Sequence, residues 1–187
     1  MRWTWSLLFA LVLTILVIEV TGYFLPARMD VEHSAEIPAP RAEVFELVAD
    51  LGTWPSWAPL LRGPDDAPLQ PEFTGDERGL GAQMLVRYED DQQVLFTIVE
   101  HEPPARLSIN TRSGLPTDDL FAGDGFEAWD DLTLESLSPS RTHLTWRRRG
   151  SEIESYWIRF LDRFVVRARI EASLADQLDA IATHVGG

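Results

Sequence analysis

Polar and apolar residues alternate along much of the chain after residue 30, which is the pattern of strands buried on one face. The first alternating run, residues 31–37, places His33 on its apolar face. The last two runs flank residues 138–140, Ser-Pro-Ser, and predict a β-hairpin. The later runs, including the two hairpin strands, cover 82–88, 94–98, 107–109, 126–137 and 142–149.

Two segments after the first strand have helical character instead. Val44, Phe45 and Val48 give one apolar face to a helix that begins at Arg41. The compact aromatic segment 54–59 predicts a short second helix. Both precede the main run of strands.

The C-terminal tail, residues 154–185, repeats apolar residues at helical spacing. A helix of this length measures about 45–50 Å, enough to cross the whole domain. Its apolar stripe consists of Trp157, Leu161, Phe164, Ala168, Leu174, Leu178 and Val185. Segments 62–80 and 113–125 are rich in Gly, Pro and Asp, so we interpret them as loops and as candidates for the border of a cavity entrance.

The order of these elements is strand, two helices, a run of antiparallel strands and a long helix. This order predicts one α+β domain over residues 28–187, in which a single curved antiparallel sheet wraps around the C-terminal helix and covers its apolar stripe. A segment of roughly 160 residues is long enough to bury a core without disulfides or metals.

The N-terminal segment, residues 3–25, is apolar apart from Glu19, and about 20 such residues suffice to cross a bilayer. Aromatic residues stand at both of its ends, as in membrane-spanning helices, and Pro26 ends the helix. We therefore expect residues 1–27 to form a single-pass membrane anchor. A cleaved signal peptide is the alternative, because the residues around Pro26 weakly resemble a cleavage site. Arg2 precedes the helix, so the positive-inside rule places the domain outside the cytoplasm.

Composition excludes several classes of function. The chain has no cysteine, which excludes disulfides, thiolate metal sites and cysteine nucleophiles. Its formal net charge is −14, from 30 acidic and 16 basic residues. An acidic surface repels the phosphate backbone, so nucleic acid is not an expected partner.

Two local motifs, together with the order of elements, resemble the polyketide cyclase/dehydrase and lipid-transport superfamily, also called START-like or SRPBCC. The motifs are Ile37-Pro38-Ala39-Pro40-Arg41-Ala42-Glu43-Val44-Phe45 and Leu51-Gly52-Thr53-Trp54-Pro55-Ser56-Trp57. The glycine turn Gly79-Leu80-Gly81-Ala82 and the helix beginning at Tyr156 also match. The resemblance covers about residues 30 to 185 and implies a helix-grip fold.

The resemblance also implies a cavity between the sheet and the long helix, suited to an apolar or amphipathic molecule. We expect no cofactor. It implies no particular activity, because the superfamily includes cyclases, hydroxylase subunits, lipid carriers and hormone receptors. Apolar pockets are lined mainly by aromatic and aliphatic side chains, although such residues equally fit a plain core. The candidate lining residues are Phe45, Trp54, Trp57, Met84, Phe96, Trp129, Trp146, Arg148, Trp157, Leu161 and Phe164.

Three ionisable residues are candidates for catalytic chemistry: His33, Asp130 and Asp131. A carboxylate inside an apolar cavity has a raised pKa and can act as a general acid or base. Exposed or structural positions are the alternative for all three. Arg148 fits an anionic head group of a ligand, an ion pair with Asp130 or Asp131, a contact with phospholipid head groups, or a solvated strand end. The histidines lack metal-ligand spacing, so no metal site is predicted.

Three hypotheses about function follow. The first is a membrane-anchored binding or carrier protein for a hydrophobic small molecule or lipid. The second is a cyclase/dehydratase- or hydrolase-type enzyme that uses a cavity carboxylate or His33. The third is a non-catalytic interaction or stress-response module whose cavity is filled by side chains.

Overall fold

The computed structural model describes residues 2–63, 65–88, 92–114 and 126–186. Alternating segments form strands, and segments of helical spacing form helices, as the sequence predicts. The elements are α1 (Arg2–Phe24), β1 (Arg28–Ile37), α2 (Arg41–Ala49), η1 (Leu51–Thr53), α3 (Trp54–Trp57), η2 (Pro59–Leu61), β2 (Glu72–Thr74), β3 (Gln83–Arg87), β4 (Gln93–Glu102), β5 (Arg106–Gly114), β6 (Phe126–Ser138), β7 (Arg141–Glu152), α4 (Tyr156–Leu161), η3 (Asp162–Val166) and α5 (Arg167–Gly186). The turns η1 and η2 are 3-10 helical, and η3 is a π-helical turn.

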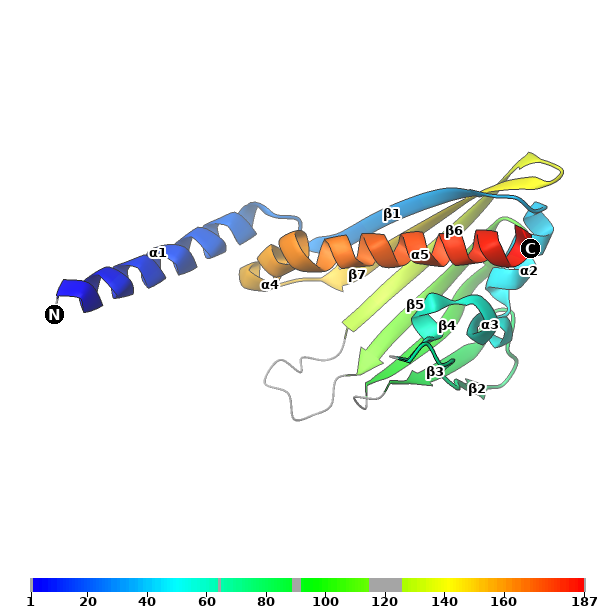
Figure 1. The fold of residues 1–187 in the computed structure, drawn as a ribbon, viewed down its shortest axis with the longest axis horizontal. Coiled ribbons are helices and arrows are strands. Elements are labelled where there is room, and N and C mark those ends of the chain that lie inside the picture. The colour runs from blue at the N-terminus through cyan, green and yellow to red at the C-terminus, as the bar shows by residue number, and fades with distance from the viewer. Residues whose placement is uncertain (1, 64, 89–91, 115–125, 187) are drawn as a thin grey trace.

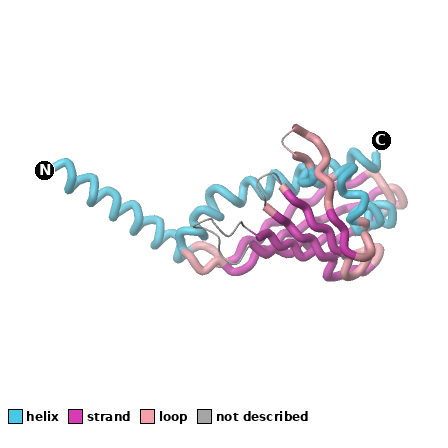
Figure 2. Tube along the Cα trace, turned by 90° about the horizontal axis from the view of Figure 1, so that it is seen from below, coloured by secondary structure: helices cyan, strands magenta, loops and turns pink. Residues whose placement is uncertain are grey.

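The seven strands form one antiparallel sheet in the order β1-β7-β6-β5-β4-β3-β2. The first strand therefore pairs with the last, and β1 and β2 are the two edges. Helix α5 runs lengthwise along one face of the curved sheet (Figure 1), and the sheet lies on one side of the helices in the second view (Figure 2). This arrangement confirms the predicted α+β helix-grip class. Part of the predicted loop 113–125 lies outside the described residues.

The core lies between the inner face of the sheet and α5. In β6, alternate residues from Ala128 to Leu134 are buried, because successive side chains of a strand point to opposite faces. Leu174, Leu178 and Ile181 of α5 face them and are fully buried. The short helices close one end of the core, where the indole of Trp54 donates to the backbone oxygen of Val48 at 3.1 Å.

Glycine at positions 79 and 81 allows the turn that leads into β3. Both have positive φ, 88° and 85°, which L side chains rarely adopt. Gly81 donates to the backbone oxygen of Ile98, so the turn joins β4 at the start of the ladder. The same end of the domain carries the ion pair of Arg78 with Asp50, which follows α2.

The predicted C-terminal helix is present but is interrupted by the π-helical turn η3. Ser155 caps its N-terminus by accepting from the backbone nitrogen of Ile158 at 3.5 Å. The extra residue of a π-turn rotates the following helix relative to the preceding one. As a result α5 buries its apolar stripe, whereas Trp157 and Phe164 are exposed.

Helix α1 projects away from the domain at the end opposite the C-terminus (Figure 1). Its side chains from Trp5 to Phe24 are almost all exposed, and by length and composition this stretch is apolar enough to cross a membrane. A signal sequence passes the same criterion. The end of α1 packs on α4, where the rings of Tyr23 and Tyr156 meet at 5.7 Å.

Candidate ligand-binding site

Two hollows lie in succession between the sheet and the C-terminal helix. The inner hollow has a volume of about 210 Å³ and the outer hollow about 380 Å³. Phe126, at the start of β6, lines both of them. Ile170 faces the outer hollow, and Leu174, one helical turn further along α5, faces the inner one.

The inner hollow mixes apolar and polar walls. Strands β4 to β7, η2 and α5 contribute to it. Its lining residues are Leu60, Tyr88, Val94, Phe96, Thr111, Ser113, Phe126, Arg148, Ser173, Leu174 and Gln177.

A buried ion pair supports the polar side of the inner hollow. Asp130 and Arg148 are register partners on β6 and β7, and the guanidinium donates twice to the carboxylate, at 2.7 and 2.9 Å. The same carboxylate accepts from the indole of Trp146 at 2.8 Å and from the hydroxyl of Thr111 at 3.1 Å. Four donors therefore occupy Asp130. This carboxylate therefore orients Arg148, which lines the inner hollow.

Gln177 on α5 adds a polar atom that lacks a protein partner. The residue is only 2% exposed, yet among the described residues its Oε1 has no hydrogen-bond partner. Buried amide oxygens are nearly always paired, and leaving one unpaired costs about 1–3 kcal/mol. An occupant of the hollow with a hydroxyl or N–H group would satisfy it.

The outer hollow is almost entirely apolar. It lies between β1, β6, β7 and the segment from α4 to α5. Its lining residues are Met29, Phe126, Ser151, Ile153, Ile158, Leu161, Asp162, Val166 and Ile170. Burial raises the pKa of Asp162, an effect that nearby Arg167 and Arg163 only partly offset. This site is suited to a hydrocarbon chain.

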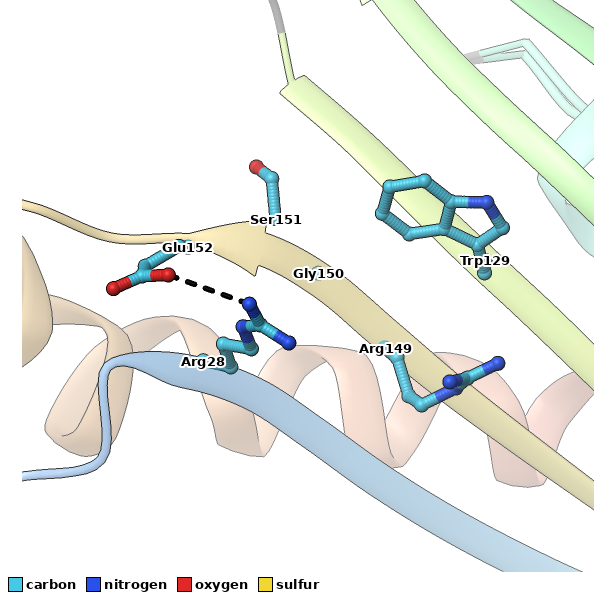
Figure 3. A pocket seen from close by; sticks show the side chains of 6 residues that line it. All are labelled: Arg28, Trp129, Arg149, Gly150, Ser151 and Glu152. Atoms are coloured by element: carbon cyan, nitrogen blue, oxygen red, sulfur yellow. Dashed lines mark hydrogen bonds and ion pairs between the residues drawn. The ribbon is translucent and has the colours of Figure 1, made fainter.

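A third hollow, on the outer face of the sheet, is polar and its charged groups are already paired. Figure 3 shows Arg28 pointing toward Glu152, at 3.3 Å, while the ring of Trp129 stands on the neighbouring strand. Arg149, which also lines it, pairs with Asp131. Among the described residues no group of three histidine or carboxylate side chains could hold a metal ion.

The family model for polyketide cyclase/dehydrase and lipid transport proteins matches residues 28–186. The chain belongs to this family. The match leaves out only α1 and the few residues that follow it, so the family domain is the sheet together with its helices. No curated protein matches the sequence.

Solved structures of similar fold include the following three. DynU16, encoded in the dynemicin biosynthetic locus, has 20% identity and a TM-score of 0.55; the match covers 84% of this chain but 47% of DynU16, about half its length. A protein from Thermobifida fusca has 19% identity and a TM-score of 0.58, and the match covers 84% of this chain and 93% of that protein. Norcoclaurine synthase from Thalictrum flavum, in complex with dopamine and hydroxybenzaldehyde, has 12% identity and a TM-score of 0.60. The match covers 89% of this chain and 90% of the synthase. At these identities the likeness shows the fold alone.

The structure places the predicted catalytic candidates of this family member apart from one another. Asp130 is on the inner face of the sheet, and Asp131 is on the outer face, bound to Arg149 and to the hydroxyl of Ser108 at 2.6 Å. His33 has the register of the inner face but is exposed, because β1 is an edge strand with a neighbour on one side only. The three residues do not form one constellation.

The predicted lining residues divide into five groups. Phe96 and Arg148 line the inner hollow, and Leu161 lines the outer one. Trp129 belongs to the outer face of the sheet, because it is out of phase with Ala128 and Asp130 on β6. Trp157 in α4 and Phe164 in η3 are exposed. The core contains Phe45, Trp54, Trp57, Met84 and Trp146.

Several lining residues were not predicted. Gln177 could have been found from the sequence, because it lies between Leu174 and Leu178 on the apolar stripe, where a polar residue is unusual. Phe126 begins the alternating run 126–137, but the pattern alone does not show that it lines both hollows. Met29 and Ile153 belong to chain segments that meet the outer hollow only through the pairing of β1 with β7.

Proposed function

We propose that this chain is a membrane-anchored binding or carrier protein for an amphipathic molecule that has an apolar tail and a small polar head. The observation that carries the proposal is the Gln177 oxygen in the inner hollow, which no described residue pairs with and which lies in the same wall as Arg148. Hydrophobic pockets with a few placed polar groups are typical of small-molecule sites.

The two hollows suggest how such a molecule lies. The head enters the smaller inner hollow, where Gln177 accepts a hydrogen bond from it. Asp130 uses the Nε–H and one Nη2–H of Arg148, so Nη1 and the second Nη2–H remain as donors for an oxygen of the head. The tail then passes Phe126 and lies in the larger apolar hollow along Ile170.

Anchoring is supported by α1. A helix that is mostly apolar, with almost all of its side chains from Trp5 to Phe24 exposed, is unstable in water, so it needs a bilayer around it. Only Leu25, Pro26 and Ala27 separate α1 from β1, which keeps the domain at the membrane surface. A carrier of this kind would exchange its ligand with the bilayer or with a partner in the same compartment.

The proposal is tested by native mass spectrometry of the full chain, purified in detergent from its membrane, followed by organic extraction. We expect one amphipathic molecule per chain. Gln177→Leu should reduce its occupancy, because the variant loses the acceptor without opening space. Gln93→Leu, the same change at an exposed position on β4, is the matched control and should retain the ligand.

An empty wild-type protein that also ignores added fatty acids, isoprenoids and lysolipids would refute the proposal. In that case the third hypothesis, an interaction module, becomes the better one. If Gln177→Leu and Gln93→Leu bind the ligand with equal occupancy, the protein binds a ligand but Gln177 does not contact its polar head.

A further inference from the structure

The segment Tyr156–Val166, formed by α4 and η3, exposes apolar side chains that a domain in water would bury. Trp157 is 43% exposed and Phe164 is 59% exposed, and Ile158, Val165 and Val166 are exposed as well. Trp157 stacks on Phe160, whose ring in turn meets Phe164 at 4.8 Å. Contiguous exposed patches of this kind mark sites of interaction with proteins or membranes. We call this segment the aromatic ridge.

The aromatic ridge is continuous with the apolar surface of α1. Gly22 lies directly against Tyr156, and a Cβ at Gly22 would overlap the Tyr156 carbonyl. The ring of Tyr23 also meets Tyr156. A surface that contacts the last turns of α1 therefore also contacts the aromatic ridge.

Arginines border the ridge although the chain as a whole is acidic, with a net charge of −14. Residues 156–170 contain four arginines and a single acidic residue, Asp162. Arg163 and Arg169 are exposed. A row of aromatic and aliphatic residues beside arginines is the composition of helices that lie in the interface of an anionic bilayer.

We propose that the aromatic ridge is a second membrane-contact surface, which lies in the bilayer interface beside α1. The inference rests on the anchoring part of the proposed function and goes beyond it, since a tethered domain need not touch lipid. Ile158, Leu161 and Val166 belong both to the ridge and to the wall of the outer hollow. The ridge therefore places the apolar hollow at the level of the lipid chains, and the bilayer is the source of its occupant.

The test uses the full chain in vesicles of phosphatidylcholine and phosphatidylglycerol. Because the chain has no cysteine, a single cysteine can carry a spin label at each chosen position. Trp157→Cys and Phe164→Cys report on the ridge, and Leu13→Cys reports on α1. Leu80→Cys is the matched control, because Leu80 is also apolar and 72% exposed but belongs to the glycine turn near α2.

We expect labels at Trp157 and Phe164 to be more accessible to oxygen than to an aqueous nickel complex, as in lipid, and the label at Leu80 to show the reverse. If the labels at positions 157 and 164 are as accessible to the nickel complex as the label at position 80, while the label at position 13 is in lipid, the ridge does not contact the membrane. The proposed anchoring through α1 would then still hold. A label at Leu13 in water would overturn anchoring and the ridge together. Dipolar broadening between copies at Phe164 would overturn the ridge in favour of a second copy of this chain.

Discussion

Replacing Asp130 with alanine is expected to lower the free energy of unfolding by about 3–5 kcal/mol, the usual effect of removing one partner of a buried ion pair. The Asp130 side chain is 2% exposed and that of Arg148 is 18% exposed. Alanine would leave the guanidinium without its counter-charge and the indole N–H of Trp146 without an acceptor. An unpaired buried donor alone costs about 1–3 kcal/mol. Since Arg148 keeps some contact with water, the lower end of the range is expected.

The neighbouring pair on the same hairpin is the matched control. Asp131 binds Arg149 on the outer face of the sheet, where the two side chains are 23% and 50% exposed. Exposed pairs contribute about 0.2–1 kcal/mol, so Asp131→Ala should cost about 1 kcal/mol. Urea unfolding of the full chain in detergent, followed by far-ultraviolet circular dichroism, measures both changes by linear extrapolation.

A double substitution separates the ion pair from simple packing. Asp130→Leu combined with Arg148→Met removes both charges and keeps similar volume. The part of the loss that comes from the unpaired guanidinium should therefore be recovered, whereas the indole N–H of Trp146 still lacks its acceptor. The reasoning is refuted if Asp130→Ala costs no more than Asp131→Ala. It is refuted as well if the double variant is as unstable as the sum of its single changes, because coupling between the two residues would then be absent.

Three further predictions concern titration and helix packing. The hydrogen bond from Arg147 lowers the pKa of Asp30 below 3.8. The stabilisation from this pair is therefore fully present above pH 3.8 and is lost as the pH falls through the lowered pKa. Asp30→Asn should abolish this loss of stability in acid, measured by urea unfolding at several pH values. Burial raises the pKa of Asp162, so its contribution to stability is fully present below pH 3.8 and is lost as the pH rises through the raised pKa. Asp162→Asn should therefore gain stability relative to wild type toward neutral pH. A difference in unfolding free energy between the two that stays constant with pH would contradict this. Gly22→Leu should separate α1 from α4 by overlap with Tyr156, seen as a longer, broader spin-label distance between the two helices.

The elements of the fold could be predicted because their patterns are local. Alternation over 31–37 and helical spacing from Arg41 reflect which side of each element is buried, and the structure confirms β1 and α2. The hairpin of β6 and β7 follows from Ser138-Pro139-Ser140 in the same way. The wrapping of the sheet around the last helix followed from the order of elements, since few arrangements cover so long an apolar stripe.

The site was less predictable because it depends on contacts between distant segments. Alternation places Asp130 and Arg148 on inward faces, but only the register of β6 against β7 decides that they meet. The same alternation turns Trp129 outward, although its size favoured burial. The π-turn at Asp162–Val166 shifts the helical phase by about one residue, so Trp157 and Phe164 leave the stripe that Leu174 continues.

The order of charges along the C-terminal helix argues that its two ends face different surroundings. A helix is stabilised by acidic residues in its first turn and by basic residues in its last, each by about 0.3–1 kcal/mol. Here residues 156–170 contain four arginines and one acidic residue, whereas residues 171–186 contain Glu171, Asp176 and Asp179. The last turn of α5 does hold a basic residue, His184. Since the dipole acts only on the first and last turns, helix stability does not explain the excess of arginine along residues 156–170. An anionic surface at the α1 end, and water at the other, would explain it, which is the arrangement that the aromatic ridge requires.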